Sequence, residues 1–340
     1  YEWLAHMYQY AVPPDRFFTE HPEWFALIDG KRVSTGQLCT TADGLVDRMA
    51  KYVLDSYKRN PQLRVLGIEA NDGAGWCECD KCRALDIPTL LTPYNQVSLT
   101  PRLIDFNTRV ARKVAEQDPD AIVGWYIYSD HTEVPPGASS LPSNMHGRVC
   151  TYTAFSNYAE PIETGQSPQN VRLRGVLEGY RKLLTHMSTY EYWSGYNWFG
   201  PMPIRKAIAA NIRYYAKLGL EGSYLLGPEH WGSQGFNYWM VGRLLWDPSQ
   251  SEEDLLEDYC KGFFGPAAEP MQTYFLHLER AVADSGMVVQ SGGSYIEPLF
   301  TPAVTERALE LLAEAPDLAP DAVVAVGHGQ MKEGRLAAVM

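Results

Sequence analysis

The sequence predicts an α/β fold of the (β/α)8 TIM-barrel type that lacks its first two strands in this chain and carries a C-terminal helical extension. Three observations favour this class. Short runs of apolar, β-branched and aromatic residues recur up to residue 231, as in buried parallel strands. Segments of helical periodicity separate these runs, which indicates βαβ units. After residue 247 only helical patterns follow. We therefore expect a barrel-like catalytic domain over residues 1–247 and a helical region packed on it over 248–340.

The expected strands are six in number, whereas a closed barrel needs eight. They cover residues 2–10, 63–72, 121–130, 147–155, 186–195 and 221–231. Because the chain starts inside a strand-like run, we expect the two missing strands to precede Tyr1. An open sheet is the alternative.

The expected helices follow the strands and then fill the C-terminal region. Between the strands they cover residues 43–60, 99–120, 171–186 and 202–219. Beyond the last strand they cover residues 236–247, 251–265 and 267–286, and a final helix starts at Thr301–Pro302.

Composition excludes some classes of function and favours another. The chain has 340 residues and a formal net charge of −12, which argues against a nucleic-acid partner because phosphate binding requires a basic face. No apolar run approaches the roughly 18 residues that a transmembrane segment needs. The 9 Trp, 21 Tyr and 11 Phe provide apolar faces with polar tips, which suit sugar rings, although many must also serve the core.

Polar residues recur where the predicted strands end, which is where barrel enzymes place their chemistry. Glycoside hydrolysis needs two carboxyl groups about the scissile bond, and Asp72, Glu191 and Glu229 are the catalytic candidates. The candidates for substrate binding are polar or aromatic residues beside them: His6, Asn71, Tyr128, Asp130, His131, Tyr192, Trp193, His230 and Trp231.

Each carboxylate also has a structural interpretation. Asp72 precedes a glycine and can simply stabilise a turn. Glu191 lies between two tyrosines, where an unpaired buried carboxylate would be costly, and Glu229 can orient His230. Glu69 is more typical of a strand residue that faces a helix or a partner charge.

Four cysteines gather in one part of the sequence. They are Cys39, Cys77, Cys79 and Cys82, and this is the number of thiolates that a structural tetrahedral zinc takes. Two disulfides and free packed thiols are the alternatives.

Three stretches resemble a bacterial family, the domain of unknown function 4838. They are "HPEWFALIDGKR" at 21–32, "QLCTTADG" at 37–44 and "EANDGAGWCECDKC" at 69–82; the later segments "GLEGSYLLGPEHWGSQGFNYWMVGRLLWDP" and "DYCKGFFGPAAEPM" are similar to that family as well. The resemblance covers roughly residues 5 to 280. It implies a glycoside hydrolase-like barrel related to α-glucuronidase-type barrels, and a periplasmic or extracellular location.

The resemblance also suggests roles for individual residues. Retaining hydrolases of the large clan A place an Asn–acid pair after strand four and a nucleophilic Glu on strand seven. Asn71–Asp72 and Glu191 are similar in layout, except that Asp stands where that clan uses Glu. This layout makes Asp72 the general acid/base and Glu191 the nucleophile or base, with Glu229 able to take part instead.

The predicted function is therefore hydrolysis of glycosidic bonds in a poly- or oligosaccharide, with no cofactor for catalysis and a structural zinc as the expected metal. A non-catalytic carbohydrate-binding barrel is the alternative. A zinc-dependent hydrolase is a third reading, disfavoured because a cysteine-rich site has no open position for water. Self-association through exposed barrel edges is also expected, because unpaired edges need covering.

Overall fold

The computed structural model describes residues 2–3, 6–152, 156–194, 198, 200–227, 230–292 and 298–318. It divides into two compact units. Unit 1 comprises residues 1–150 and 176–189, and unit 2 comprises residues 151–175 and 190–340. The predicted division at residue 247 stays a prediction.

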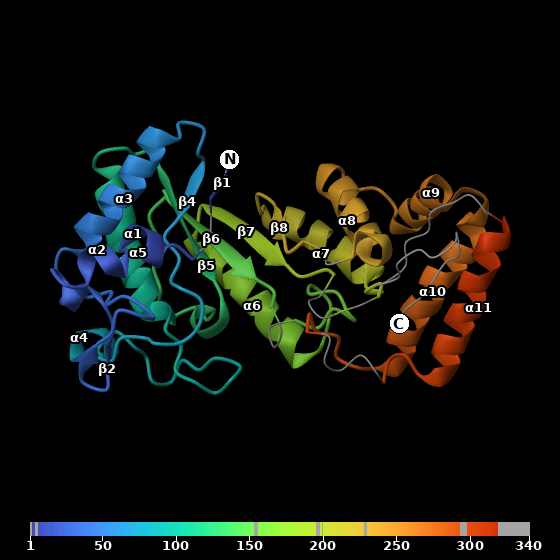
Figure 1. The fold of residues 1–340 in the computed structure, drawn as a ribbon, viewed down its shortest axis with the longest axis horizontal. Helices are drawn as coiled ribbons and strands as arrows, with labels where there is room; N and C mark the ends of the chain where they lie inside the picture. Colours follow the sequence, from blue (N-terminus) through green and yellow to red (C-terminus); the bar gives the residue numbers. More distant parts are fainter. Residues whose placement is uncertain are drawn as a thin grey trace. The chain divides into compact units, whose positions relative to one another are not determined.

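The strands of the main sheet follow the hydrogen-bonded order β1–β4–β5–β6–β7–β8 (Figure 1). Their bounds are β1 Glu2–Trp3, β4 Val65–Gly67, β5 Ile122–Ile127, β6 Met145–Cys150, β7 His186–Glu191 and β8 Ser223–Leu225. The pairs β1–β4, β4–β5 and β5–β6 are all parallel. Five of the six predicted strands contain the observed one, and β6 begins two residues before its predicted run; every observed strand is shorter than the run that predicted it.

Unit 1 covers its sheet with helices that connect successive strands. Its elements outside the sheet are α1 Tyr8–Ala11, α2 Pro14–Phe17, η1 Pro22–Trp24, the hairpin β2 Leu27–Ile28 and β3 Lys31–Arg32, α3 Leu45–Arg59, α4 Asp80–Arg83, α5 Thr100–Ala115 and η2 Ser129–His131. Helices α3 and α5 pack side by side (Figure 1). Leu103, Phe106 and Val110 recur at helical spacing and are buried, which fixes the inner face of α5.

Unit 2 is mostly helical. Its elements are α7 Arg205–Leu218, β8, α8 Trp231–Trp246, α9 Glu252–Phe264, η4 Gly265–Ala267, α10 Ala268–Ser285 and α11 Pro302–Leu318, while α6 Pro168–Leu183 and β7 run from one unit into the other. Ser251 caps α9, since its hydroxyl accepts a hydrogen bond from the Asp254 N–H at 3.2 Å. Among the described helices, none is long and apolar enough to cross a membrane.

The prediction of an eight-stranded TIM barrel is wrong for this chain. The described residues form a six-stranded sheet that begins at β1 and stops at β8, so the fold is an α/β partial barrel. Alternation of strands and helices predicts parallel βα units, but closure depends on strand number, tilt and shear, which no local pattern encodes.

Candidate functional site

Three neighbouring strands of unit 1 deliver polar side chains to one place. β1, β4 and β5 are parallel neighbours, so their carboxyl ends lie at the same edge of the sheet. His6 follows β1 and pairs with Glu69, which follows β4, in an isolated parallel bridge. Asp130 and His131 follow β5 in the turn η2. The structure thus brings together the predicted residues of these strand ends.

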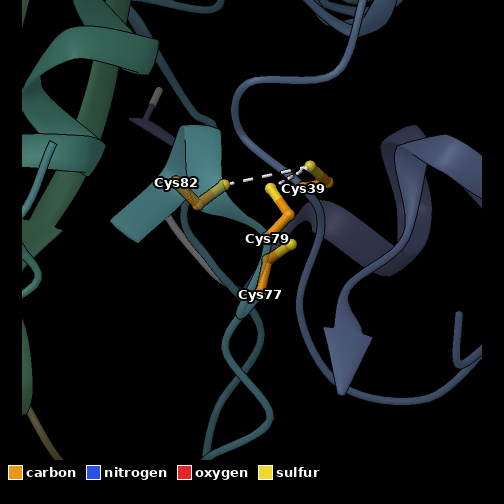
Figure 2. Close-up of side chains that lie close together, drawn as sticks. All are labelled: Cys39, Cys77, Cys79 and Cys82. Carbon is orange, nitrogen blue, oxygen red and sulfur yellow. Dashed lines mark hydrogen bonds between the residues drawn. The ribbon is translucent and has the colours of Figure 1, made fainter. Parts of the chain in front are cut away.

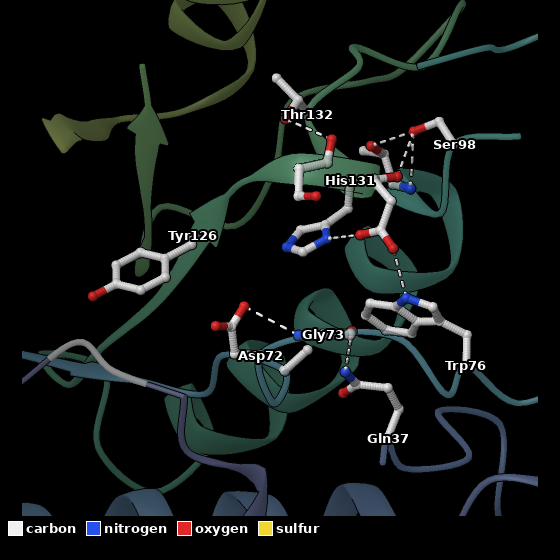
Figure 3. A network of polar contacts seen from close by, with 12 residues as sticks. Gln37, Asp72, Gly73, Trp76, Ser98, Tyr126, His131 and Thr132 are labelled. Carbon is white, nitrogen blue, oxygen red and sulfur yellow. Dashed lines mark hydrogen bonds and ion pairs between the residues drawn. The ribbon is translucent and has the colours of Figure 1, made fainter. Parts of the chain in front are cut away.

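A buried charge network underlies this edge. The His131 ring contacts Glu69 Oε1 at 3.1 Å through Nε2 and Asp130 Oδ1 at 2.8 Å through Nδ1. The Trp76 indole N–H donates to the other oxygen of Asp130 at 2.6 Å (Figure 3). Glu69 Oε2 also accepts the backbone N–H of Tyr126. Every polar atom of the His131 ring is therefore engaged with a carboxylate.

His131 is positively charged at neutral pH. Burial alone would lower the pKa of His131, but the hydrogen bonds from its ring to Asp130 and Glu69 outweigh burial and raise the pKa to about 9. The imidazolium is the counter-charge of Glu69, which is 2% exposed, while the second carboxylate, Asp130, is 24% exposed and so reaches solvent. This arrangement satisfies the rule that buried charges are paired. It assigns His131 and Glu69 to holding the site together beneath the groups that face solvent.

Asp72 is the carboxylate of this edge that faces solvent, with 67% of its side chain exposed. One oxygen accepts the Gly73 N–H at 3.1 Å (Figure 3) and lies 4.0 Å from His6 Nε2. The other ring nitrogen of His6 is 2.6 Å from the Ala70 carbonyl, so Nδ1 carries a proton and Nε2 is directed to the Asp72 side. A carboxylate and an imidazole so placed can exchange protons with a bound ligand.

Aromatic rings border this pair. The Tyr126 ring lies edge-on to His6 with centroids 5.8 Å apart, and the Tyr128 ring is 6.3 Å from His6 and 6.2 Å from His131. Rings beside carboxylates and imidazoles are suited to the apolar face and hydroxyl rim of a sugar.

The loop that carries Asp72 is bound on both sides. Asn71 uses its amide for the fold: Nδ2 donates to the Gly36 carbonyl at 2.6 Å, and Oδ1 accepts the Gln9 N–H at 3.1 Å. Gly36 and Gly75 meet back to back with positive φ angles of 100° and 92°. A Cβ on Gly36 would lie 3.2 Å from the Gly75 carbonyl oxygen, so a side chain there would be crowded against the backbone as well as strained by the positive φ angle.

The four predicted cysteines form one cluster (Figure 2). Their sulfurs all lie within 4.8 Å of one another, with Cys39 Sγ at 3.7 Å from Cys79 Sγ and 3.8 Å from Cys82 Sγ. Two sulfurs on a tetrahedral zinc with bonds of about 2.3 Å lie about 3.8 Å apart, whereas a disulfide joins them at about 2.05 Å. All four thiols are free, and the cluster can hold a metal ion.

The surroundings of the cluster favour a thiolate at Cys39. Cys77 Sγ accepts the Leu27 N–H at 3.3 Å, and the Thr41 hydroxyl lies 3.2 Å from Cys82 Sγ. Hydrogen bonds from Cys77 and Cys82 lower the pKa of Cys39, and Arg32 contributes in the same direction, while the contacts with Cys39 raise the pKa of Cys77 and of Cys82. Metal ions bind the deprotonated form, so these contacts suit a metal centre.

The remaining predicted residues belong to unit 2. Glu191 is fully buried and accepts hydrogen bonds from Thr151 Oγ1 at 2.6 Å and Tyr215 OH at 2.8 Å. Tyr192 and Trp193 are buried next to it in the chain, whereas Trp231, at the start of α8, is 64% exposed. His230 is the N-cap residue of α8. Glu229 lies outside the described residues.

Sequence reasoning missed two residues that hold the edge of unit 1 and undervalued a third. Trp76 and Gln37 did not stand out, and Glu69 was interpreted as an ordinary strand residue. Trp76 sits between a glycine turn and the cysteines, where a large aromatic is unusual, and this was the available signal. Gln37 carries no signal in sequence, because its partners lie 34 and 36 residues away.

The family described as a domain of unknown function (DUF4838) matches residues 1–277. A search of curated proteins found no match. One solved structure, a GH138 enzyme targeting pectin rhamnogalacturonan II, is similar with a TM-score of 0.35 and 8% sequence identity, over 72% of this chain and 35% of that chain.

Proposed function

This chain belongs to the DUF4838 family, and we propose that it is a carbohydrate-active enzyme that hydrolyses glycosidic bonds. The proposal rests on the residues at the carboxyl ends of β1, β4 and β5 in unit 1. There, an exposed carboxylate, Asp72, stands beside the His6 imidazole and the rings of Tyr126 and Tyr128, above the buried pair Glu69–His131. This combination offers proton transfer and ring stacking at the carboxyl ends of parallel strands.

In this proposal Asp72 is the general acid/base, and His6, Tyr128 and Asp130 bind sugar hydroxyls. The second carboxylate is Glu191 or Glu229. Glu191 is buried between hydroxyls and so contributes only if its cover opens to the ligand. Unit 2 would contribute further residues to sugar binding: Tyr192, Trp193, His230 and Trp231. Of the three aromatic side chains among them, Trp231 is the exposed one.

The test is turnover of a panel of glycosides, including uronides, by the unsubstituted protein and by Asp72→Asn, Glu191→Gln and Glu229→Gln. General acid–base catalysis contributes about 10²- to 10⁴-fold, so Asp72→Asn should lower kcat by at least about 100-fold. Asp120→Asn is the matched control, since Asp120 is exposed and precedes the opposite end of β5. Full activity of Asp72→Asn would remove Asp72 from the mechanism, and the larger loss among the two glutamate variants identifies its partner.

A carbohydrate-binding protein without turnover is the second candidate. The burial of Glu191 favours it, because of the two catalytic candidates that the structure describes only Asp72 faces solvent, and glycoside hydrolysis takes two carboxyl groups. Saturable binding of an oligosaccharide by calorimetry, with no product released from the whole panel, would support this function over hydrolysis.

We further propose that the cysteine cluster holds a structural zinc. Cys39, Cys77, Cys79 and Cys82 would supply all four ligands, so the ion stabilises the fold and has no open position for water. One zinc per chain by elemental analysis is expected, with loss of that zinc in Cys79→Ser. Cys260→Ser is the matched control, because Cys260 is a free thiol outside the cluster.

Export to the periplasm or exterior also stays a proposal. In an oxidising compartment unbound thiols form disulfides, and a bound metal protects them. Thiol alkylation of protein isolated under non-reducing conditions would distinguish a zinc-protected cluster, which reacts after chelation, from an oxidised one, which reacts only after reduction.

A further inference from the structure

The Gln37 side chain forms hydrogen bonds to the backbone on both sides of Asp72. Its Nε2 donates to the Asn71 carbonyl at 2.6 Å and to the Gly73 carbonyl at 3.1 Å, while its Oε1 accepts the Asn71 N–H at 3.0 Å. Both N–H donors of the amide and its oxygen are thereby engaged with a single loop. Gln37 is 1% exposed, so these bonds are sheltered from water. Figure 3 shows Gln37 reaching Gly73 directly beside Asp72.

The position of Asp72 depends on this loop. The contacts described for the Asp72 side chain are the N–H of its neighbour Gly73 and the His6 ring at 4.0 Å. A side chain that is 67% exposed and has such local contacts takes its direction from its own backbone. The groups that fix this backbone are therefore the ones that aim the carboxylate.

The segments joined by Gln37 are the segments joined by the cysteine cluster. Gln37 precedes Cys39 by two residues, and the loop from Asn71 to Trp76 runs directly into Cys77. The Gln37 N–H also donates to the Gly75 carbonyl at 3.2 Å. A metal on the thiolates would hold Cys39 against residues 77–82. Through its hydrogen bonds to the loop, Gln37 would pass this constraint on to the backbone of Asp72.

We propose that Gln37 is a positioning residue that couples metal binding at the cysteine cluster to the order of the Asp72 loop. With metal bound, the amide holds the loop in one conformation. Without metal, the 37–39 segment keeps its backbone hydrogen bonds to residues 24–26 but loses the link through the thiolates to residues 77–82. The three hydrogen bonds from Gln37 to the loop are then made only part of the time. The importance of this coupling for turnover rests on the proposed role of Asp72, but the coupling itself does not.

The experiment is hydrogen exchange on the full chain, with zinc bound and after chelation, read by mass spectrometry with electron-transfer fragmentation, which assigns exchange to single amides. The reporter is Gly73 N–H, which bonds to the Asp72 side chain rather than to Gln37. Zinc removal should raise its exchange rate at least about tenfold in the unsubstituted protein. Strands β5 and β6 provide internal control peptides whose exchange should change little.

Two variants isolate Gln37, and a third is the control. Gln37→Leu removes all three bonds, and Gln37→Glu retains an acceptor for the Asn71 N–H but removes both donors. Both should keep one zinc per chain, because the thiolates are intact. Both should show fast Gly73 exchange with zinc bound and little further change on chelation. This non-additivity is expected if zinc acts on the loop through Gln37, because the substitution already removes that link. Gln117→Leu, at an exposed glutamine of the same unit, should behave like the unsubstituted protein.

The proposal is overturned if zinc removal accelerates Gly73 exchange in Gln37→Glu by the same factor as in the unsubstituted protein, or if it does not affect this exchange at all. If Gln37→Leu fails to fold by circular dichroism, the Gln37→Glu data alone decide. Absence of turnover in every sample would refute the proposed hydrolase function and leave the exchange result intact.

Discussion

Glu69 in unit 1 and Glu191 in unit 2 are two buried carboxylates at strand ends with different partners. Glu69 faces the His131 imidazolium at 3.1 Å, whereas Glu191 accepts hydrogen bonds from the Thr151 and Tyr215 hydroxyls. An ion pair makes each partner depend on the charge of the other, while hydroxyls can rotate to suit either a charged or a neutral acceptor. Glu69 therefore depends on the charge of its partner, whereas the hydroxyls beside Glu191 can adapt to either charge state of the carboxyl group.

The largest effect is expected from breaking the ion pair. His131→Leu leaves Glu69 buried without its counter-charge, which should lower the free energy of unfolding by about 3–5 kcal/mol in urea denaturation. Adding Glu69→Gln to this variant should recover part of the loss, because the uncompensated charge is then gone. A loss below about 1 kcal/mol, or no recovery in the double variant, would contradict the ion-pair description.

The second effect is a pH dependence specific to unit 1. The pKa of His131 is raised to about 9, so its stabilising contribution is complete below the unfolded-state pKa of about 6.5 and is lost as pH rises through about 9. This rise in the pKa of His131 corresponds to about 3 kcal/mol of stability. Urea denaturation between pH 6 and 10 should show this decline in the unsubstituted protein and not in His131→Leu. Parallel profiles for the two proteins would place the titration elsewhere.

A smaller effect is expected at Glu191. Glu191→Gln replaces one accepting oxygen by an NH2 group, so one of the two hydroxyls must reverse its hydrogen bond, at a cost of about 1–3 kcal/mol. Tyr215→Phe is the companion variant, since it removes one donor and keeps the carboxylate. In thermal denaturation both variants should lose less stability than His131→Leu. A larger loss in the Glu191 variants than in His131→Leu would remove the distinction between the two carboxylates.

The smallest effect is expected at Asp72. Its side chain is 67% exposed, so Asp72→Asn should change the free energy of unfolding by less than about 0.5 kcal/mol, as should the control Asp120→Asn. The same Asp72 substitution should have the largest effect on turnover. A stability loss above about 1 kcal/mol would instead make Asp72 a structural turn residue.

The local pattern of the sequence predicted much of unit 1. Runs such as Ile122–Ile127 are apolar throughout because both faces of a parallel strand are buried, and the polar residues that follow them converge because neighbouring parallel strands end at one edge. The spacing of the cysteines predicted a cluster, and all four thiols do come together.

The roles of Gln37 and Glu69 could not be predicted from the local sequence, because they depend on partners that are distant along the chain. Gln37 gains its role from loop carbonyls more than thirty residues away, and Glu69 from a histidine 62 residues later. The eight-stranded barrel was wrong because a run of βα units has the same local pattern whether or not the sheet closes. Whether Asp72 acts together with Glu191 or Glu229 stays a prediction.

The back-to-back contact of Gly36 and Gly75 has a consequence for mutational scanning. Both residues have positive φ angles and face backbone atoms, so every replacement at either position is strained and crowded, and no change at one glycine makes room at the other. If Asp72 acts as proposed, a library scored by activity would rank the two glycines with Asp72, although neither glycine carries a functional group. A parallel score for the amount of folded protein would separate them, because Asp72 variants would keep full abundance while variants of the glycines lose it.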